Sequence, residues 1–279
     1  MRPTDRELER LGVHYRKRVL RIIHRAGAGH TGGSLSCLDL LNVIYNCVLR
    51  VGPSTINSPD RDRYIQSKGH SVEALYVVLA DCGFFAASEL ETLCRAGSHF
   101  VGHPTRKVPG VEQNTGALGH GLSLGVGMAI AGKLDDRDYR VFVLLGDGEL
   151  AEGSNWEAAI SAAHHRLDNL VAIVDHNRLQ ITGRTRDVCN NEPLDEKFRA
   201  FGWLVRRIDG HCIADITAAL VERPTTGMPL CVIADTIKGK GVSFMEGNVK
   251  WHHGVPTDAE LSQALAELDA QLSTLEARP

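Results

Sequence analysis

Hydrophobic positions along the chain form two kinds of pattern, which are short continuous runs and longer stripes at helical spacing. A short run without polar alternation predicts a strand that is buried on both faces. The runs are Tyr64–Gln66, Arg140–Leu145, Leu170–Val174 and Leu230–Ala234, and the helices expected around them cover residues 34–50, 71–82, 120–134, 154–165 and 212–222. Strands that alternate with helices in this way predict a doubly wound α/β fold with a mostly parallel sheet. Ligands of such sheets bind at the carboxyl ends of the strands.

Two further helices are predicted from capping boxes. The box at residues 4–7 precedes a helical stripe that continues to Gly27. A second box at residues 257–260 precedes leucines that are spaced alternately by four and three residues, which predicts an amphipathic helix over about 257–277. Because this stripe is short for a coiled coil, we expect the helix to pack onto its own domain.

Composition narrows the class of protein. The chain has 279 residues, of which 43% are hydrophobic and 23% charged, and we expect a single domain over 1–279. Lys and Arg total 31 against 34 Asp and Glu, so no basic field favours a nucleic-acid partner. The seven cysteines contain no CxxC spacing, which argues against a disulfide framework or a zinc knuckle. No signal-like or membrane-spanning run is present, so we expect a cytoplasmic protein without a membrane partner.

One motif carries chemistry. The run that ends at Leu145 is followed at once by Gly146-Asp147-Gly148, and Asn177 comes 30 residues after Asp147, beyond the next run. A carboxylate and an amide oxygen from neighbouring strand ends suit Mg²⁺, which prefers oxygen ligands and shares them with phosphates. The glycines allow backbone N–H groups to approach a diphosphate, and a helix that begins near Gly153 adds its N-terminal dipole. A lone GDG is a common turn, but the asparagine at the second strand end makes the pattern specific.

The GDG and Asn pattern resembles that of thiamine diphosphate enzymes, and other blocks narrow the resemblance to transketolases. They occur in that family's order and cover essentially the whole chain. The blocks are Gly29-His30-Thr31-Gly32-Gly33, Ser67-Lys68-Gly69-His70, Gly102-His103-Pro104, Thr115-Gly116-Ala117-Leu118-Gly119-His120-Gly121, and Lys238-Gly239-Lys240-Gly241 followed by His252-His253-Gly254. The resemblance implies a thiamine diphosphate-binding fold with thiamine diphosphate and Mg²⁺ as cofactors, Ca²⁺ or Mn²⁺ being possible substitutes for the metal.

The resemblance also assigns a metal site. Asp147 and Asn177 would bind the cation through their side chains, and Leu179 would bind it through its backbone carbonyl. The N–H of Gly148 would contact the diphosphate.

A second set of cofactor contacts lies in the glycine-rich loop after the last predicted strand. There Lys238 and His253 would meet the diphosphate from the opposite side. His252 stands beside His253, so either imidazole could be the contact, and His253 is favoured because it directly precedes Gly254.

Three histidines lie in glycine-containing loops rather than on an apolar face. Ketol transfer requires proton removal from a donor hydroxyl and proton delivery to the acceptor aldehyde, which imidazoles can perform. By resemblance, His103 would bind the first hydroxyls of the donor, and His30 and His253 would handle protons at the reacting carbonyl. His70 would bridge the diphosphate and the substrate.

The remaining assignments concern the pyrimidine end of the cofactor. Gly116 and Leu118 would contact the aminopyrimidine, and Glu152 would sit at a subunit interface and support a glutamate on the partner. The sequence departs from the family pattern at His120, where Gln is common, and at His176, where a second Asn is common. Neither change removes a metal or phosphate contact.

A transketolase requires a glutamate from a pyrimidine-binding domain, and this chain has only one predicted helix after the loop that ends at Gly254. The resemblance therefore implies the N-terminal subunit of a split, heteromeric transketolase. It would transfer a two-carbon ketol unit from a ketose phosphate to an aldose acceptor. It would act only with a C-terminal subunit that carries the pyrimidine-binding domain, in a heterotetramer.

Other functions compete with this interpretation. One is half of a 1-deoxyxylulose-5-phosphate synthase-like or 2-oxo acid dehydrogenase-like enzyme, against which Gly102-His103-Pro104 and Glu152 argue. Another is a non-catalytic scaffolding chain, which would have no need for the full set of metal and histidine residues. The sequence leaves the sugar open among pentose phosphates, branched sugars and sulfonated sugars.

Overall fold

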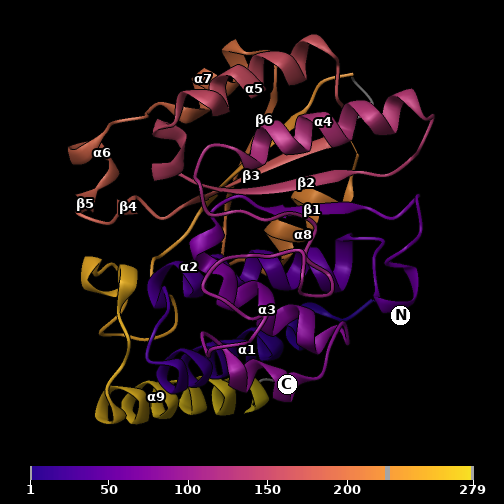
Figure 1. The fold of residues 1–279 in the computed structure, drawn as a ribbon. Helices are drawn as coiled ribbons and strands as arrows, with labels where there is room; N and C mark the ends of the chain where they lie inside the picture. The colour runs from indigo at the N-terminus through magenta and orange to yellow at the C-terminus, as the bar shows by residue number, and fades with distance from the viewer. Residues whose placement is uncertain (1, 224–226, 278–279) are drawn as a thin grey trace.

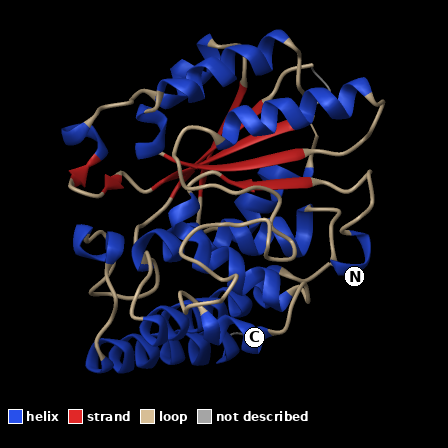
Figure 2. Cartoon of the chain, viewed as in Figure 1, coloured by secondary structure: helices blue, strands red, loops and turns tan. Residues whose placement is uncertain are grey.

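A five-stranded parallel sheet runs through the centre of the chain. The structure, a computed structural model, describes residues 2–223 and 227–277. In spatial order the strands are β1 (Arg63–Gln66), β2 (Val141–Gly146), β3 (Leu170–His176), β7 (Leu230–Asp235) and β6 (Leu204–Asp209) (Figure 2). A separate hairpin consists of β4 (Leu179–Gln180) and β5 (Gly183–Arg184). After β3 the chain passes over the position of β7 to form β6 first, a change of strand order that often marks a ligand site.

Helices cover both faces of the sheet (Figure 1). One face carries α4 (Gly121–Leu134), α5 (Gly153–His164) and α7 (Leu194–Ala200). The other carries α2 (Thr31–Val43), α3 (Val72–Asp81) and α8 (Ile213–Val221), and α1 (Asp5–Ala26) and α9 (Asp258–Ala277) form an outer layer. Shorter helical segments are Ile44–Val48, Pro53–Thr55, Gly69–Ser71, Ala87–Thr92, Gly148–Ala151, Val249–His253 and α6 (Thr185–Val188). The predicted doubly wound α/β fold is confirmed.

The central strands read as unbroken apolar runs because they contact two cores. In β2, Phe142 and Leu144 pack into the core beneath α2 and α3, whereas Val141, Val143 and Leu145 pack into the core beneath α4 and α5. Successive side chains of a strand point to opposite faces, so both sets must be apolar.

The structure differs from the sequence-based prediction at two places. Strand β6 and helix α7 were not predicted, because β6 is an edge strand whose Arg206 and Arg207 interrupt the apolar pattern. Helix α2 begins at Thr31 rather than near residue 34. Its first turn holds Gly32, where a Cβ would lie 2.8 Å from the Trp251 carbonyl oxygen, so glycine allows the helix to approach that loop.

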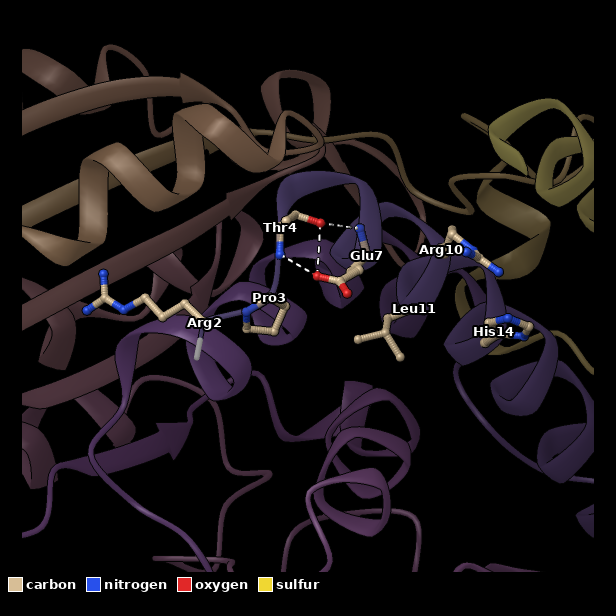
Figure 3. A pocket seen from close by; sticks show the side chains of 7 residues that line it. All are labelled: Arg2, Pro3, Thr4, Glu7, Arg10, Leu11 and His14. Carbon is tan, nitrogen blue, oxygen red and sulfur yellow. Dashed lines mark hydrogen bonds between the residues drawn. The ribbon is translucent and has the colours of Figure 1, made fainter. Parts of the chain in front are cut away.

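Helix α1 starts and ends as its sequence predicts. Thr4 Oγ1 accepts a hydrogen bond from the Glu7 N–H, and the Glu7 carboxylate accepts one from the Thr4 N–H at 2.7 Å (Figure 3). Gly27 ends the helix at a φ of 67°. A surface hollow of about 600 Å³ adjoins the box and is lined by Arg2, Pro3, Thr4, Glu7, Arg10, Leu11 and His14.

The C-terminal helix α9 packs against α1 of the same chain (Figure 1). Leu268 and Ala264 are fully buried there. An ion pair between Lys17 and Asp269 flanks the apolar contact. The leucine stripe of α9 is therefore covered by its own chain. Within the described residues no helix is both long and apolar enough to cross a membrane.

This packing predicts that Leu268→Ala lowers the free energy of unfolding by about 2–5 kcal/mol, as expected for a large buried aliphatic side chain. Ser273→Ala is the control, because Ser273 is exposed on the same helix and its hydroxyl bonds only to the helix backbone at Asp269. This control should change the free energy by less than about 0.5 kcal/mol. Urea unfolding followed by circular dichroism measures both. Equal effects of the two substitutions would contradict the buried position of Leu268.

Candidate active site

A cavity of about 530 Å³ opens at the carboxyl ends of β1, β2, β3 and β7. Most of the side chains singled out from the sequence line it. The lining residues are His30, Lys68, His70, His103, Gly116, Leu118, Gly146, Asp147, Gly148, Glu149, Ala151, Glu152, Asn177, Leu179, Gln180, Ile181, Thr182, Lys238 and His252. Segments that are far apart in the sequence therefore meet at this edge of the sheet, as parallel strands require.

The turn after β2 and the turn after β3 bring the three proposed metal ligands together. The strands pair in register, with Gly146 opposite Asp175. The Asp147 carboxylate accepts hydrogen bonds from the N–H of Gly148 at 2.8 Å and of Arg178 at 2.6 Å. The Asn177 amide oxygen accepts one from the Leu179 N–H at 3.1 Å.

The chemistry of these donors fits a hard divalent cation that also binds phosphate. Lys238 Nζ donates to the Leu179 carbonyl at 3.1 Å, so a cation already contacts the oxygen assigned to the metal. No cluster of three or more His, Cys, Asp or Glu side chains suited to a metal occurs among residues 2–223 and 227–277. One carboxylate, one amide oxygen and one carbonyl suit Mg²⁺, which completes its shell with water and phosphate oxygens. Burial and the nearby Asp175 raise the pKa of Asp147 to about 6, and a bound cation would oppose that shift.

Glu149 holds the turn in place from below, a role that sequence reasoning missed. Its carboxylate accepts hydrogen bonds from the N–H groups of Gly146 and Gly119, both at 3.0 Å, and from Ser67 Oγ. Burial raises its pKa, while these three donors act in the opposite direction. One side chain thus joins the turns after β1 and β2 to the loop before α4.

His30 lies at the centre of the histidine cluster. Its ring centroid is 5.5 Å from that of His70, 5.9 Å from His103, 5.8 Å from His252 and 4.6 Å from His253. Burial lowers the pKa of His30 to about 4, with further lowering by His253 and His103. Burial also holds the pKa of His70 well below its usual range. The two rings are therefore uncharged near neutral pH and can exchange protons with a bound ligand.

The structure distinguishes the two adjacent histidines after Lys238. His252 lines the cavity, and its Nδ1 lies 2.9 Å from Lys238 Nζ. Its ring also stacks on His70 with a centroid distance of 5.3 Å. His253 is exposed and contacts His30 instead. This geometry favours His252, rather than the expected His253, as the partner of Lys238 at a diphosphate.

The residues assigned to the pyrimidine end also lie at the cavity. Gly116 has a φ of 140°, and a Cβ there would lie 2.7 Å from the His103 ring, so only glycine allows this approach. Leu118 is half-buried, and Glu152 is exposed at the rim.

The two departures from the family pattern have different surroundings. His120 is exposed, with Nδ1 3.1 Å from the Leu118 carbonyl. His176 is buried between Asp235 at 2.8 Å and Glu192 at 2.7 Å. Neither of them lines the cavity.

A buried ion pair beneath the cavity was not predicted either. Lys68 and Asp175 are 1% and 0% exposed and form a salt bridge. Asp175 also accepts hydrogen bonds from Ser36 and Thr236. Burial opposes charge on both groups, yet their pairing lowers the pKa of Asp175 and raises that of Lys68. The signal in the sequence is a lysine directly after a buried strand, where a charge needs a partner.

Comparison with known proteins agrees with this site. Residues 11–271 match the family model described as the thiamine diphosphate binding domain of transketolase. The chain belongs to the transketolase family. One of the two chains of an apulose-4-phosphate transketolase from Phocaeicola vulgatus is 49% identical over 262 residues, which are 94% of this chain and 93% of that one. A chain of a 6-deoxy-6-sulfo-D-fructose transketolase from a Clostridium species is 41% identical and covers 92% of this chain and 94% of the relative.

The solved structures show how much of a longer transketolase this chain represents. The transketolase of Campylobacter jejuni superposes with a TM-score of 0.83 at 27% identity, over 96% of this chain but 48% of that one. The chain therefore spans about half the length of this transketolase. The predicted resemblance and the predicted thiamine diphosphate-binding fold are confirmed.

The ion pair makes a prediction about stability. Lys68→Met should lower the free energy of unfolding by about 3–5 kcal/mol, because it leaves the Asp175 carboxylate buried without a countercharge. The double variant Lys68→Met/Asp175→Asn should recover most of that loss. Because the folded-state pKa of Asp175 is lowered, the wild-type stabilisation is present above the usual carboxyl range and fades in acid. Chemical denaturation of the three proteins at neutral and acidic pH tests this, and additive effects of the two substitutions would contradict it.

Proposed function

We propose that this chain is the diphosphate-binding subunit of a two-chain transketolase that transfers a two-carbon ketol unit from a ketose phosphate to an aldose acceptor. The observation that carries the proposal is the cavity itself, which combines oxygen ligands for a cation, the buried Lys238 and the histidine cluster in one transketolase-family domain. Two relatives of nearly the same length are named as transketolase subunits, which supports a partner chain.

The cofactor contacts follow from the donors at the strand ends. Asp147, Asn177 and the Leu179 carbonyl would hold Mg²⁺, with Ca²⁺ or Mn²⁺ as substitutes. The Gly148 N–H and Lys238 would contact the diphosphate. Burial and the neighbouring Lys68 lower the pKa of Lys238 to about 8, a cost that an anionic ligand would relieve. When bound, thiamine diphosphate supplies a carbanion equivalent at its thiazolium ring.

The histidines would perform the proton transfers. His103 is positioned at the mouth to bind donor hydroxyls, and His30, at the centre of the cluster, would take or deliver a proton at the reacting carbonyl. His70 would bridge the diphosphate and the substrate, and His253 would assist at the carbonyl, with His252 taking the diphosphate contact. Uncharged imidazoles suit both directions of transfer.

A partner would complete the site at its exposed rim. Gly116, Leu118 and Glu152 line that side of the cavity, so a pyrimidine-binding subunit docked there would supply the glutamate that activates the cofactor. We propose a heterotetramer with two copies of each chain. All seven cysteines are free, which suits the reducing cytoplasm.

The metal assignment predicts a loss of cofactor binding. Asp147→Ala removes the carboxylate ligand and should weaken Mg²⁺-dependent binding of thiamine diphosphate more than about 100-fold in the assembled enzyme. The fold should persist, because the substitution removes a desolvated acid rather than core volume. Isothermal titration calorimetry gives the affinity, with the exposed Asp215→Ala as control. Unchanged affinity in Asp147→Ala would refute the assignment.

The partner assignment predicts that the purified chain has no turnover by itself. Without a carboxylate at the pyrimidine the cofactor is not deprotonated efficiently, and water reaches the open cavity. The chain is assayed with Mg²⁺, thiamine diphosphate, a ketose phosphate and an aldose phosphate, first alone and then with a pyrimidine-binding subunit. Turnover should appear only in the mixture. Substantial ketol transfer by the lone chain would show that the site is completed in another way.

A further inference from the structure

Behind the histidine cluster lies a buried carboxyl group that none of the contacts described so far uses. Glu73, in the first turn of α3, is fully buried. Burial raises its pKa to about 7. Among residues 2–223 and 227–277 no cationic side chain forms an ion pair with it. A desolvated acid without a countercharge is costly, so a contact that it alone makes should justify its presence.

The contacts of Glu73 converge on His30. Oε1 accepts a hydrogen bond from the backbone N–H of His30 at 3.2 Å, and Oε2 accepts one from Ser34 Oγ at 2.8 Å. These two donors flank the start of α2, so one carboxyl group holds both the last loop residue and the first helical turn. The position of the His30 main chain is therefore fixed by a side chain from another helix.

The loop before His30 is shaped to admit this carboxyl group. Gly29 has a φ of 154°, and a Cβ there would lie 2.8 Å from Glu73 Oε1 and 2.7 Å from Ile23. Any side chain at this position would displace the acid or the loop. Gly29 and Glu73 thus form a matched contact.

Glu73 also links two of the histidine loops. It follows His70 by three residues, so the segment that carries His70 into the cavity also carries the anchor of His30. The two rings lie 5.5 Å apart between centroids. Their relative placement therefore depends on the geometry of one short segment.

We propose that Glu73 is a positioning residue that fixes the main chain of His30 and thereby aims its imidazole at the reacting carbonyl. Glu73 does not touch the substrate; it acts through His30. The proposal rests on the proposed function for the role of His30, but the anchoring contact is independent of that function.

The first test measures turnover in the assembled two-chain enzyme. Glu73→Ala should lower kcat about 10-fold to 100-fold, because a small displacement of a reacting group is costly. KM for the ketose and the affinity for thiamine diphosphate should change less than about twofold. Glu73→Gln should restore most of kcat, since its amide oxygen accepts from the His30 N–H and its amide nitrogen can donate to Ser34 Oγ. Asp81→Ala, at the far end of α3, is the matched control and should leave kcat unchanged.

A double-mutant cycle separates positioning from general damage. If Glu73 acts through His30, Glu73→Ala should have little further effect in a His30→Ala background. Additive losses would overturn the proposal, and so would a failure of Glu73→Gln to restore kcat. If Glu73→Ala does not fold, Glu73→Met keeps the volume without an acceptor and takes its place in the cycle.

A second readout needs neither partner nor cofactor. His30 faces His70, His103, His252, His253, Lys68 and Lys238, and with burial these groups lower its pKa. In Glu73→Ala the released loop should expose the ring, and nuclear magnetic resonance of the lone chain should show the pKa of His30 rising toward 6.5. Glu73→Gln should keep it low. An unchanged titration in Glu73→Ala would overturn the proposal. If the wild-type pair shows no ketol transfer but His30 shifts as expected, the proposed function fails while the anchor stands.

Discussion

The site depends on one buried carboxylate, that of Asp175 at the end of β3. It forms an ion pair with Lys68, which follows β1, and accepts hydrogen bonds from Ser36 of α2 and Thr236 after β7. Asn177, one of the proposed metal ligands, also donates to it, at 3.4 Å. Four segments are therefore held in one geometry by a group that cannot leave its partners without exposing a charge in an apolar interior. The neighbouring turn that carries Asp147 is fixed to β3 by strand register, so the metal ligands inherit this rigidity.

A second buried network holds the loop that carries Lys238. The Asp39 carboxylate accepts hydrogen bonds from Arg16 of α1 and from Nδ1 of His211, the latter at 2.8 Å. Nε2 of His211 in turn accepts from the N–H of Ile237 at 2.9 Å, and Ile237 directly precedes Lys238. Although burial acts against it, Arg16 holds the pKa of Asp39 well below its usual range, so the carboxylate stays charged and fixes the imidazole. The outer helix α1 thus contributes to the position of the cationic side chain in the cavity.

The electrostatic character of the cavity follows from its burial. Lys238 and Lys68 place positive charge at the strand ends, and desolvation and this charge together keep His30, His70 and His252 neutral. A diphosphate would find cationic and N–H donors at the inner wall, while a carbonyl substrate would meet imidazoles that can give or accept a proton. Charge binding and proton transfer are thereby separated within one cavity. The open rim at Glu152 is where a partner would exclude water.

The fold class and the local motifs could be predicted from the sequence, because both are encoded in neighbouring residues. Unbroken apolar runs predicted the central strands, and Asp147 and Asn177 were identifiable because each follows a strand end. The edge strand β6 escaped, since its exposed arginines hide the pattern. The folded chain was needed to reveal Lys68 and Glu73 as buried groups with defined partners, because burial and hydrogen bonding across distant segments leave no local signal. It also separated His252 from His253: the turn over Val249–His253 directs adjacent side chains to different neighbours, and that direction depends on packing against Lys238 and His30 rather than on sequence.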